Sequence, residues 1–130
     1  MKVFLTGGTG FIGGTVARQL RDRDDDVLCL VRSPGKAAAL SELGCETTAG
    51  DLSDREALAK AMAGCDAAIH AAAMYEVGIP KSQRPAMHEA NVVGTENVLG
   101  AAKETEVPKI VYVSTCGAFG NTHQIGRAHV

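Results

Sequence analysis

The stretch KVFLTGGTGFIGG, from Lys2 to Gly14, joins a short apolar run to a glycine-rich turn and then to a helical pattern. Gly7, Gly10 and Gly13 are spaced G-x-x-G-x-x-G, while Gly8, Gly10 and Gly13 fit G-x-G-x-x-G. Glycine at a tight turn lets backbone N–H groups approach a pyrophosphate, and a helix N-terminus favours the same negative charge. Directly after a strand and before a helix that opens with Phe11 and Ile12, the triplet predicts a dinucleotide-binding turn rather than a merely structural one.

Beyond this turn, short apolar runs alternate with helical patterns along the chain. Most of the apolar runs are continuous, as in strands covered on both faces. The predicted strands are Lys2 to Thr6, Val27 to Val31, Cys45 to Ala49, Ala67 to Ala71 and Lys109 to Val113, and the predicted helices are Ile12 to Arg21, Ala37 to Leu43, Asp54 to Ala63 and Pro85 to Glu104. This alternation predicts an α/β fold, a doubly wound, Rossmann-like parallel sheet truncated after about five strands.

Local signals refine the predicted elements. Ser53 is expected to cap the third helix, with Glu56 completing a capping box. Tyr75 to Pro85 is expected to be one long loop at the edge where open α/β sheets bind ligands. The fourth helix should bury a continuous stripe of residues at spacings of three and four, namely Met87, Ala90, Gly94, Val98 and Ala101.

The composition describes a chain of one domain with no need for metal or disulfide stabilisation. Its 130 residues are 45% hydrophobic and 22% charged, with a net charge of −2. This charge predicts neither a nucleic-acid nor an anionic-membrane partner, and the N-terminus is too short a run for a signal peptide or membrane span. The four cysteines lack zinc-binding spacing, so we expect no metal site, reduced thiols and a cytoplasmic protein. Cys116 is either a packing residue or a reactive thiol.

The end of the second predicted strand indicates which dinucleotide is preferred. An NAD site usually has Asp or Glu there to bind the ribose 2′-hydroxyl. Here Val31 occupies that place, Arg32 follows, and Lys36 stands one loop further on. A guanidinium can pair with a 2′-phosphate, which favours NADP(H) over NAD(H). The alternative is that Arg32 stacks on adenine or faces water.

Asp51 and Leu52 follow the third predicted strand in the segment GDLSD. The Asp51 carboxylate is placed to accept a hydrogen bond from an adenine amino group, with the Leu52 backbone beside it. The structural alternative is a turn or a cap for the next helix, and the two roles are compatible.

Five ordered motifs together resemble the extended short-chain dehydrogenase/reductases, the NAD(P)-dependent epimerase/dehydratase family. They are TGGTGFIG (Thr6 to Gly13), GDL (Gly50 to Leu52), HAAA (His70 to Ala73), NVVGTENVL (Asn91 to Leu99) and VYVST (Val111 to Thr115). The resemblance covers residues 1 to about 121. It implies that Gly7, Gly10 and Gly13 hold the pyrophosphate, that Asp51 and Leu52 contact the adenine, and that Ala71, Ala72 and Ala73 contact the nicotinamide-side ribose.

The same resemblance implies supporting and catalytic roles. Asn91 would brace the cofactor pocket or satisfy a neighbouring loop, and His70 is interpreted as a strand-packing residue. Thr115, with Ser114 beside it, would hydrogen-bond the reacting substrate oxygen. The family's Tyr-x-x-x-Lys pair is missing, because Tyr75 and Tyr112 are followed four residues later by Ile79 and Cys116. We therefore expect the chain to be inactive as a catalyst by itself.

The length suggests the front part of a longer protein, since members of the family are usually more than twice as long. The last six residues, IGRAHV (Ile125 to Val130), match one reading frame of a common sequencing adapter. We therefore expect residues 1–124 to form an incomplete dinucleotide-binding domain and residues 125–130 to be non-native. The alternative is a natural short paralogue with a polar tail.

Two functional interpretations follow. In the first, the parent is an NADP(H)-preferring oxidoreductase or epimerase acting on a small-molecule carbonyl or hydroxyl substrate, with a lean towards reductases resembling dihydroflavonol reductases. In the second, the chain is a catalytically silent dinucleotide-binding or regulatory module. The resemblance also implies a homodimeric parent that associates through the helix Pro85 to Glu104.

Overall fold

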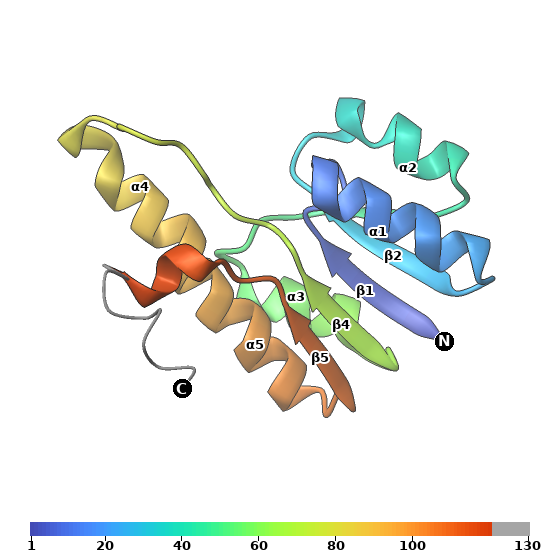
Figure 1. Ribbon diagram of the computed structural model, residues 1–130. Helices are drawn as coiled ribbons and strands as arrows, with labels where there is room; N and C mark the ends of the chain where they lie inside the picture. The colour runs from blue at the N-terminus through green and yellow to red at the C-terminus, as the bar shows by residue number, and fades with distance from the viewer. Residues whose placement is uncertain (121–130) are drawn as a thin grey trace, which may run out of the picture.

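A five-stranded, wholly parallel sheet forms the centre of the computed structural model, which describes residues 1–120 (Figure 1). The strand order is β3-β2-β1-β4-β5, so the chain reverses direction across the sheet between β1 and β4. The strands are β1 (Lys2–Thr6), β2 (Asp26–Val31), β3 (Glu46–Ala49), β4 (Ala67–His70) and β5 (Lys109–Tyr112). The predicted fold class is therefore confirmed, and every predicted strand is present within one residue of its expected ends.

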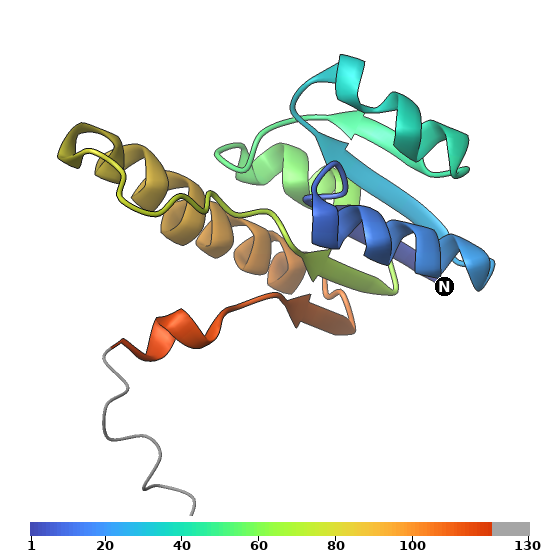
Figure 2. The ribbon, with the colours of Figure 1, turned by 45° about the horizontal axis from the view of Figure 1, so that its top comes forward.

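Helices cover both faces of this sheet (Figures 1 and 2). One face carries α1 (Phe11–Asp22) and α2 (Ala38–Glu42), and the other carries α3 (Arg55–Met62) and α5 (Gly94–Glu104). The remaining helical segments are α4 (Arg84–His88), a π-helical turn (Glu89–Val93) and three 3₁₀ turns, at Pro34–Lys36, Lys81–Gln83 and Cys116–Phe119.

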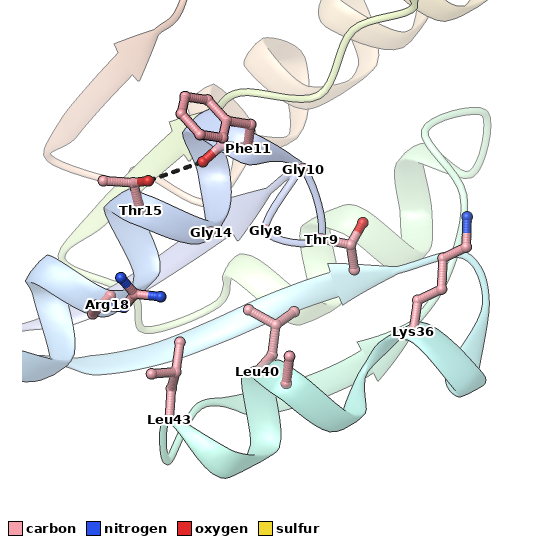
Figure 3. Close-up of a pocket in the computed structure, with 11 residues that line it drawn as sticks. Gly8, Thr9, Gly10, Phe11, Gly14, Thr15, Arg18, Lys36, Leu40 and Leu43 are labelled. Atoms are coloured by element: carbon pink, nitrogen blue, oxygen red, sulfur yellow. Dashed lines mark hydrogen bonds between the residues drawn. The ribbon is translucent and has the colours of Figure 1, made fainter.

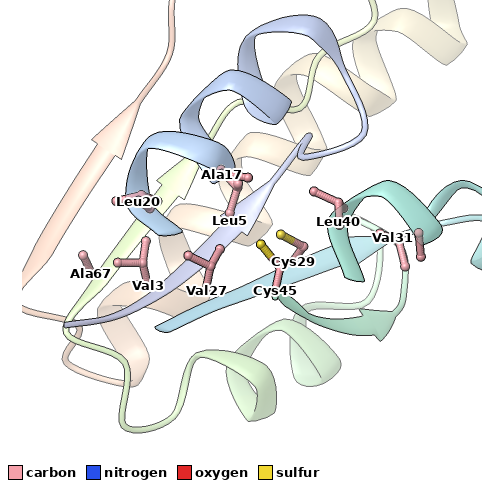
Figure 4. Close-up of a cluster of buried hydrophobic side chains, with 11 residues drawn as sticks. Val3, Leu5, Ala17, Leu20, Val27, Cys29, Val31, Leu40, Cys45 and Ala67 are labelled. Atoms are coloured by element: carbon pink, nitrogen blue, oxygen red, sulfur yellow. The ribbon is translucent and has the colours of Figure 1, made fainter. Parts of the chain in front are cut away.

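The core divides into two layers because successive strand side chains point to opposite faces. In β1, Val3 and Leu5 pack under α1 and α2, while Phe4 packs under α3 and α5. Figure 4 shows the first layer, where the sulfur atoms of Cys29 and Cys45 point toward each other. Cys29, Cys45 and Cys65 are buried, Cys116 is exposed, and all four thiols are free.

The predicted cap of the third helix is wrong by one residue. Asp54, not Ser53, is the N-cap, and its carboxylate accepts a hydrogen bond from Ala57 N at 3.0 Å. The Ser53 N–H instead donates to Asp51 Oδ1 at 2.7 Å, which holds Ser53 in the preceding turn. Asp is as good an N-cap as Ser, so the local pattern admitted both positions.

The predicted helix Pro85 to Glu104 begins earlier and is not uniform. The loop ends at Pro80, after which a 3₁₀ turn, α4, a π turn and α5 follow without a break. Gly94, Val98 and Ala101 are buried as predicted, but Met87 and Ala90 are only half-buried. Figures 1 and 2 show the reason: α4 extends past the ends of the strands, so the sheet covers only the α5 part of the stripe.

The last strand, β5, departs from the expectation that continuous apolar runs are covered on both faces. Ile110 and Tyr112 in β5 are 43% and 49% exposed. In residues 1–120, β5 pairs only with β4 and forms one edge of the sheet, so an apolar composition did not translate into burial. In that same part of the chain, no helix has the length and apolar character needed to cross a membrane.

Candidate functional site

The glycine turn lies at the point where the chain reverses direction across the sheet. Gly7 has a φ of +77°, and a Cβ placed there would lie 2.6 Å from the backbone carbon of Ala71. A Cβ on Gly13 would overlap the Gly7 carbonyl group. Both positions therefore require glycine, because the turn packs directly on the start of the loop after β4 and on the first turn of α1.

The N-terminus of α1 has no internal partner for its first amide groups. Gly10 is the N-cap, with no side-chain cap and no acidic residue in the first turn. The first N–H groups of a helix lack intrahelical acceptors, so those of Phe11, Ile12 and Gly13 have no partner within α1. Phe11 is 92% and Ile12 is 56% exposed. A helix N-terminus with these features suits an anion.

A cavity of about 320 Å³ runs along the groove between α1 and α2 (Figure 3). Gly8, Thr9 and Gly10 of the glycine turn form part of its wall, and Leu40 and Leu43 of α2 face them. In Figure 3, Thr9 and Lys36 lie at the same end of the groove, away from Arg18 and Leu43. The end of the groove beside the glycine turn therefore carries Lys36, and the opposite end carries Arg18.

A second cavity, of about 220 Å³, lies at the end of the groove that carries Lys36, next to the end of β2. It is lined by Thr9, Arg32, Ser33 and Lys36, two cations and two hydroxyl groups with no carboxylate. Val31, the last residue of β2, is buried in the core. The structure thus brings the predicted residues Arg32 and Lys36 together. Thr9 and Ser33 line the same cavity and were not predicted from the sequence.

Asp51 occupies the turn after β3 and is exposed. Hydrogen bonds from the backbone and side chain of Ser53 lower the pKa of its carboxyl group, and the positive charge of Arg32 contributes in the same direction. The structural alternative considered for Asp51, turn formation, is therefore present. An exposed, ionised carboxylate at this edge keeps one oxygen available to a ligand.

Leu52, next to Asp51, is fastened to α5. Its carbonyl oxygen accepts a hydrogen bond from Asn97 Nδ2 at 2.8 Å. A Cβ on Gly94 would lie 3.0 Å from the Leu52 Cβ, so Gly94 is what lets α5 approach this turn. Asn97 was not singled out from the sequence, although it lies in the motif that begins at Asn91.

The loop after β4 is held by Asn91, which lies in the π-helical turn. Asn91 Oδ1 accepts from Met74 N and its Nδ2 donates to Met74 O, each at 2.7 Å. Ala71 and Ala72 are half-buried against the glycine turn, and Ala73 is exposed. Asn91 therefore satisfies the neighbouring loop, and in doing so it fixes the segment that the sequence assigned to the cofactor.

His70, at the end of β4, is 1% exposed, in agreement with its interpretation as a strand-packing residue. Its Nδ1 lies 2.6 Å from Thr6 Oγ1 and its Nε2 lies 2.9 Å from Thr95 Oγ1. Its ring stacks on Tyr112 with centroids 5.8 Å apart. Burial lowers the pKa of the imidazole. Thr6 and Thr95 were missed because each partner is distant in the sequence.

Ser114 and Thr115 follow β5 and are both exposed at the carboxyl edge of the sheet. The Thr115 hydroxyl accepts a hydrogen bond from Gly117 N at 3.3 Å and caps the following 3₁₀ turn. Phe119 in that turn is exposed. Within residues 1–120, no hydrogen bond connects either hydroxyl to the glycine turn. The segment Ile125 to Val130 lies outside the described residues, and its expected non-native origin stays a prediction.

A doubly wound sheet whose glycine turn lies at the reversal of strand order defines the class of dinucleotide-binding α/β domains. The family model described as "NAD dependent epimerase/dehydratase family" matches residues 3–129. The chain belongs to this family, as its five motifs predicted.

Named relatives support the same assignment. The chain is 40% identical over 115 residues to a 4-hydroxy-2-methyl-3-oxo-4-farnesyl-3,4-dihydroquinoline-1-oxide ketoreductase of Stigmatella aurantiaca, covering 88% of this chain and 34% of that protein. It is 38% identical over 115 residues to a 2-alkyl-3-oxoalkanoate reductase of Stenotrophomonas maltophilia, covering 88% and 33% respectively. The chain thus spans about a third of the length of these relatives.

A solved structure shows the same fold. It is a UDP-glucose-4-epimerase from Stenotrophomonas maltophila with bound NAD and formylated UDP-arabinopyranose. The TM-score is 0.83 at 26% identity, and the match covers 95% of this chain and 40% of the epimerase. The chain therefore shares the fold of about two fifths of a larger structure that contains bound NAD.

Proposed function

We propose that this chain is the NADP(H)-binding N-terminal part of an oxidoreductase or epimerase that acts on a carbonyl or hydroxyl substrate. The observation that carries the NADP(H) preference is the cavity lined by Thr9, Arg32, Ser33 and Lys36. A guanidinium and an ammonium group beside a 2′-phosphate form charge-assisted hydrogen bonds with it. The carboxylate that would instead bind a ribose 2′-hydroxyl is replaced by the buried Val31.

The pyrophosphate of the cofactor fits the N-terminus of α1. No side chain caps this helix and no acidic residue lies in its first turn, so nothing in that turn competes with an anion or repels it. The N–H groups of Phe11, Ile12 and Gly13 would donate to the phosphate oxygens, and the turn Gly7 to Gly10 would let the backbone approach them. Asp51 and Leu52 would receive the adenine at the neighbouring strand end.

The loop Ala71 to Ala73 would contact the nicotinamide-side ribose, with Asn91 holding the loop through Met74. When bound, the cofactor supplies or accepts a hydride. Within residues 1–120, the Thr115 hydroxyl accepts from Gly117 N–H and donates to no group, so its proton is available to a substrate oxygen. Ser114 stands beside it as a second hydroxyl.

The names of the two reductase relatives support a carbonyl substrate for the parent protein. Proton transfer would require a Tyr-x-x-x-Lys pair, and neither Tyr75 nor Tyr112 belongs to one. We therefore expect this chain to bind the nucleotide without turning over a substrate.

The test is the affinity of the chain for NADPH and NADH, measured by nucleotide fluorescence or calorimetry. NADPH should bind more tightly, and Arg32→Ala should reduce the preference by about tenfold or more, the value of a charged hydrogen bond. Lys60→Ala is the matched control, because it removes one positive charge from an exposed site on α3 paired with Glu56. Equal affinity for the two nucleotides, unchanged by Arg32→Ala, would contradict the NADP(H) preference.

A further inference from the structure

The donor and the acceptor of each hydrogen bond around His70 can be assigned, beginning with the amides of the loop after β4. The N–H groups of Ala71 and Ala72 both point to Thr6 Oγ1, each at 3.2 Å, and the Ala71 N–H also approaches the Thr6 carbonyl at 3.3 Å. A backbone N–H can only donate, so the Thr6 hydroxyl accepts twice and uses both lone pairs. Its proton must then go to the one remaining neighbour, His70 Nδ1 at 2.6 Å. Nδ1 is therefore the unprotonated nitrogen.

The far side of the ring leads to the same assignment by an independent route. The Thr95 hydroxyl donates to the Asn91 carbonyl oxygen at 2.7 Å, and a carbonyl can only accept. With its single proton used, the Thr95 oxygen can only accept from His70 Nε2 at 2.9 Å. Nε2 therefore carries the proton. Two separate sets of partners, on β1 and on α5, demand the same tautomer.

We propose that His70 is a positioning residue: as a neutral imidazole protonated on Nε2, it passes one directed chain of hydrogen bonds from the amides of Ala71 and Ala72 to helix α5. Asn91 connects the last hydrogen bond back to the loop, since its backbone carbonyl accepts from the Thr95 hydroxyl and its side chain binds the backbone of Met74. The loop from Ala71 to Met74 is thus held at both ends by one network. That this loop faces a cofactor rests on the proposed function, whereas the direction of the hydrogen bonds does not.

Protonation of His70 would break this chain. A proton on Nδ1 would point at the Thr6 hydroxyl, whose lone pairs already serve Ala71 and Ala72. The groups facing the ring are Thr6 from β1, Thr95 from α5 and the ring of Tyr112 from β5. None of these carries a charge that would stabilise an imidazolium, and burial alone accounts for the lowered pKa. The network is therefore complete only while the ring is neutral.

The first test is the tautomer itself, read from the ring ¹⁵N and proton shifts of His70 in the 130-residue chain. The signal is assigned by its loss in His70→Gln. We expect a neutral form with the proton on Nε2 to predominate at pH 7.5, and the ring to become half protonated only below pH 6.5. A proton on Nδ1, or a charged ring at pH 7.5, would overturn the proposal whatever the chain binds.

The second test asks whether the chain positions the loop. Thr95→Val removes the acceptor for Nε2–H with little change in shape, and Thr95→Ser is the matched control that keeps the hydroxyl. We expect Thr95→Val to accelerate hydrogen exchange at the Ala71 and Ala72 amides about tenfold, with Thr95→Ser within about twofold of the unmodified chain. Equal exchange in the two variants would overturn the positioning role.

Two variants of His70 separate the hydrogen bond made by Nδ1 from the one made by Nε2. His70→Asn places a carbonyl oxygen near the position of Nδ1 and should retain protection at Ala71 and Ala72, whereas His70→Gln keeps a donor toward Thr95 and should lose it. The reverse order would contradict the assigned direction. NADPH titration of the same proteins is read separately. If the Nε2–H tautomer is present but no nucleotide binds, the proposed function fails and the network stands.

Discussion

Asn91 and Met74 form a reciprocal pair of hydrogen bonds, with Asn91 Oδ1 accepting from Met74 N–H and Asn91 Nδ2 donating to Met74 O, both at 2.7 Å. One carboxamide thereby replaces the two bonds that a neighbouring strand would make to this residue. Asn91 lies in a π-helical turn. Its side chain therefore points in another direction than it would in an unbroken α-helix, and it reaches this loop. The candidate nicotinamide-side loop is therefore fixed from the helix rather than from the sheet.

Asn91→Ala should loosen this loop. The loss of two partly exposed hydrogen bonds should lower the free energy of unfolding by about 1 to 2 kcal/mol and remove the exchange protection of the Met74 amide. Asn91→Asp separates the two bonds, since it keeps an acceptor for Met74 N–H but sets a second oxygen against the Met74 carbonyl, so the protection should be intermediate between that of Asn91→Ala and that of the unmodified chain. Urea unfolding and hydrogen exchange measure the two effects. An unprotected Met74 amide in the unmodified chain would contradict the pairing.

Gly7→Ala should be far more damaging than the same change at another left-handed glycine. Gly64 has a φ of +78° with open space around it, so Gly64→Ala should cost about 1 to 2 kcal/mol. Gly7 has a φ of +77°, and its new Cβ would also meet the Ala71 backbone, adding about 1 to 3 kcal/mol of overpacking. Denaturant midpoints of the two variants compare these costs directly. Similar midpoints would show that the turn does not pack on the loop after β4 as described.

The cysteines should differ sharply in reactivity. Burial raises the pKa of the Cys29 thiol to about 12 and also raises the pKa values of Cys45 and Cys65, so few of these thiols are ionised near neutral pH. Cys116 is exposed. Brief alkylation of the native chain, followed by peptide mass spectrometry, should label Cys116 first. Labelling of Cys29 at a comparable rate before denaturation would contradict the packed first core layer.

Stability should fall on mild acidification because of His70. Burial lowers its pKa below the ordinary value of 6.5, so the unfolded chain binds more protons than the folded chain between these two pKa values. The contribution is therefore complete above about pH 6.5 and is lost as the pH falls towards the folded pKa. Urea unfolding at several pH values from 7.5 to 5, compared with His70→Gln, isolates this effect. The free energy of unfolding should fall more with acidification in the unmodified chain than in His70→Gln. Parallel pH dependences of the two proteins would refute the contribution of His70.

Much of the fold was predictable because it depends on local patterns. The glycine spacing, the continuous apolar strands and the helical periodicity each act over a few residues, and together they indicated the doubly wound sheet. The errors arose where a local pattern admits two solutions or where burial depends on distant neighbours. Ser53 and Asp54 are both good caps, and the apolar composition of β5 could not reveal that residues 1–120 cover only one of its edges.

The candidate site divides along the same line. Arg32 and Lys36 were predictable because only three residues separate them, within the segment that leaves β2. The glycine turn was predictable from the spacing of its glycines. Thr9 and Ser33 were missed, although each lies close in the sequence to a predicted site residue, because neither carries a charge or a motif. Asn97 was missed because its partner, Leu52, is 45 residues away.

The amino-acid sequence alone determined which elements form, in what order, and where backbone must approach backbone, since glycine placement and apolar periodicity express those constraints directly. The tertiary structure alone decided which polar groups satisfy one another. Thr6 meets His70 across 64 residues and His70 meets Thr95 across 25, and only the packing of β1, β4 and α5 brings those atoms within hydrogen-bond distance. A buried polar group must find such a partner, so the fold determines both the state of His70 and the position of the loop it supports.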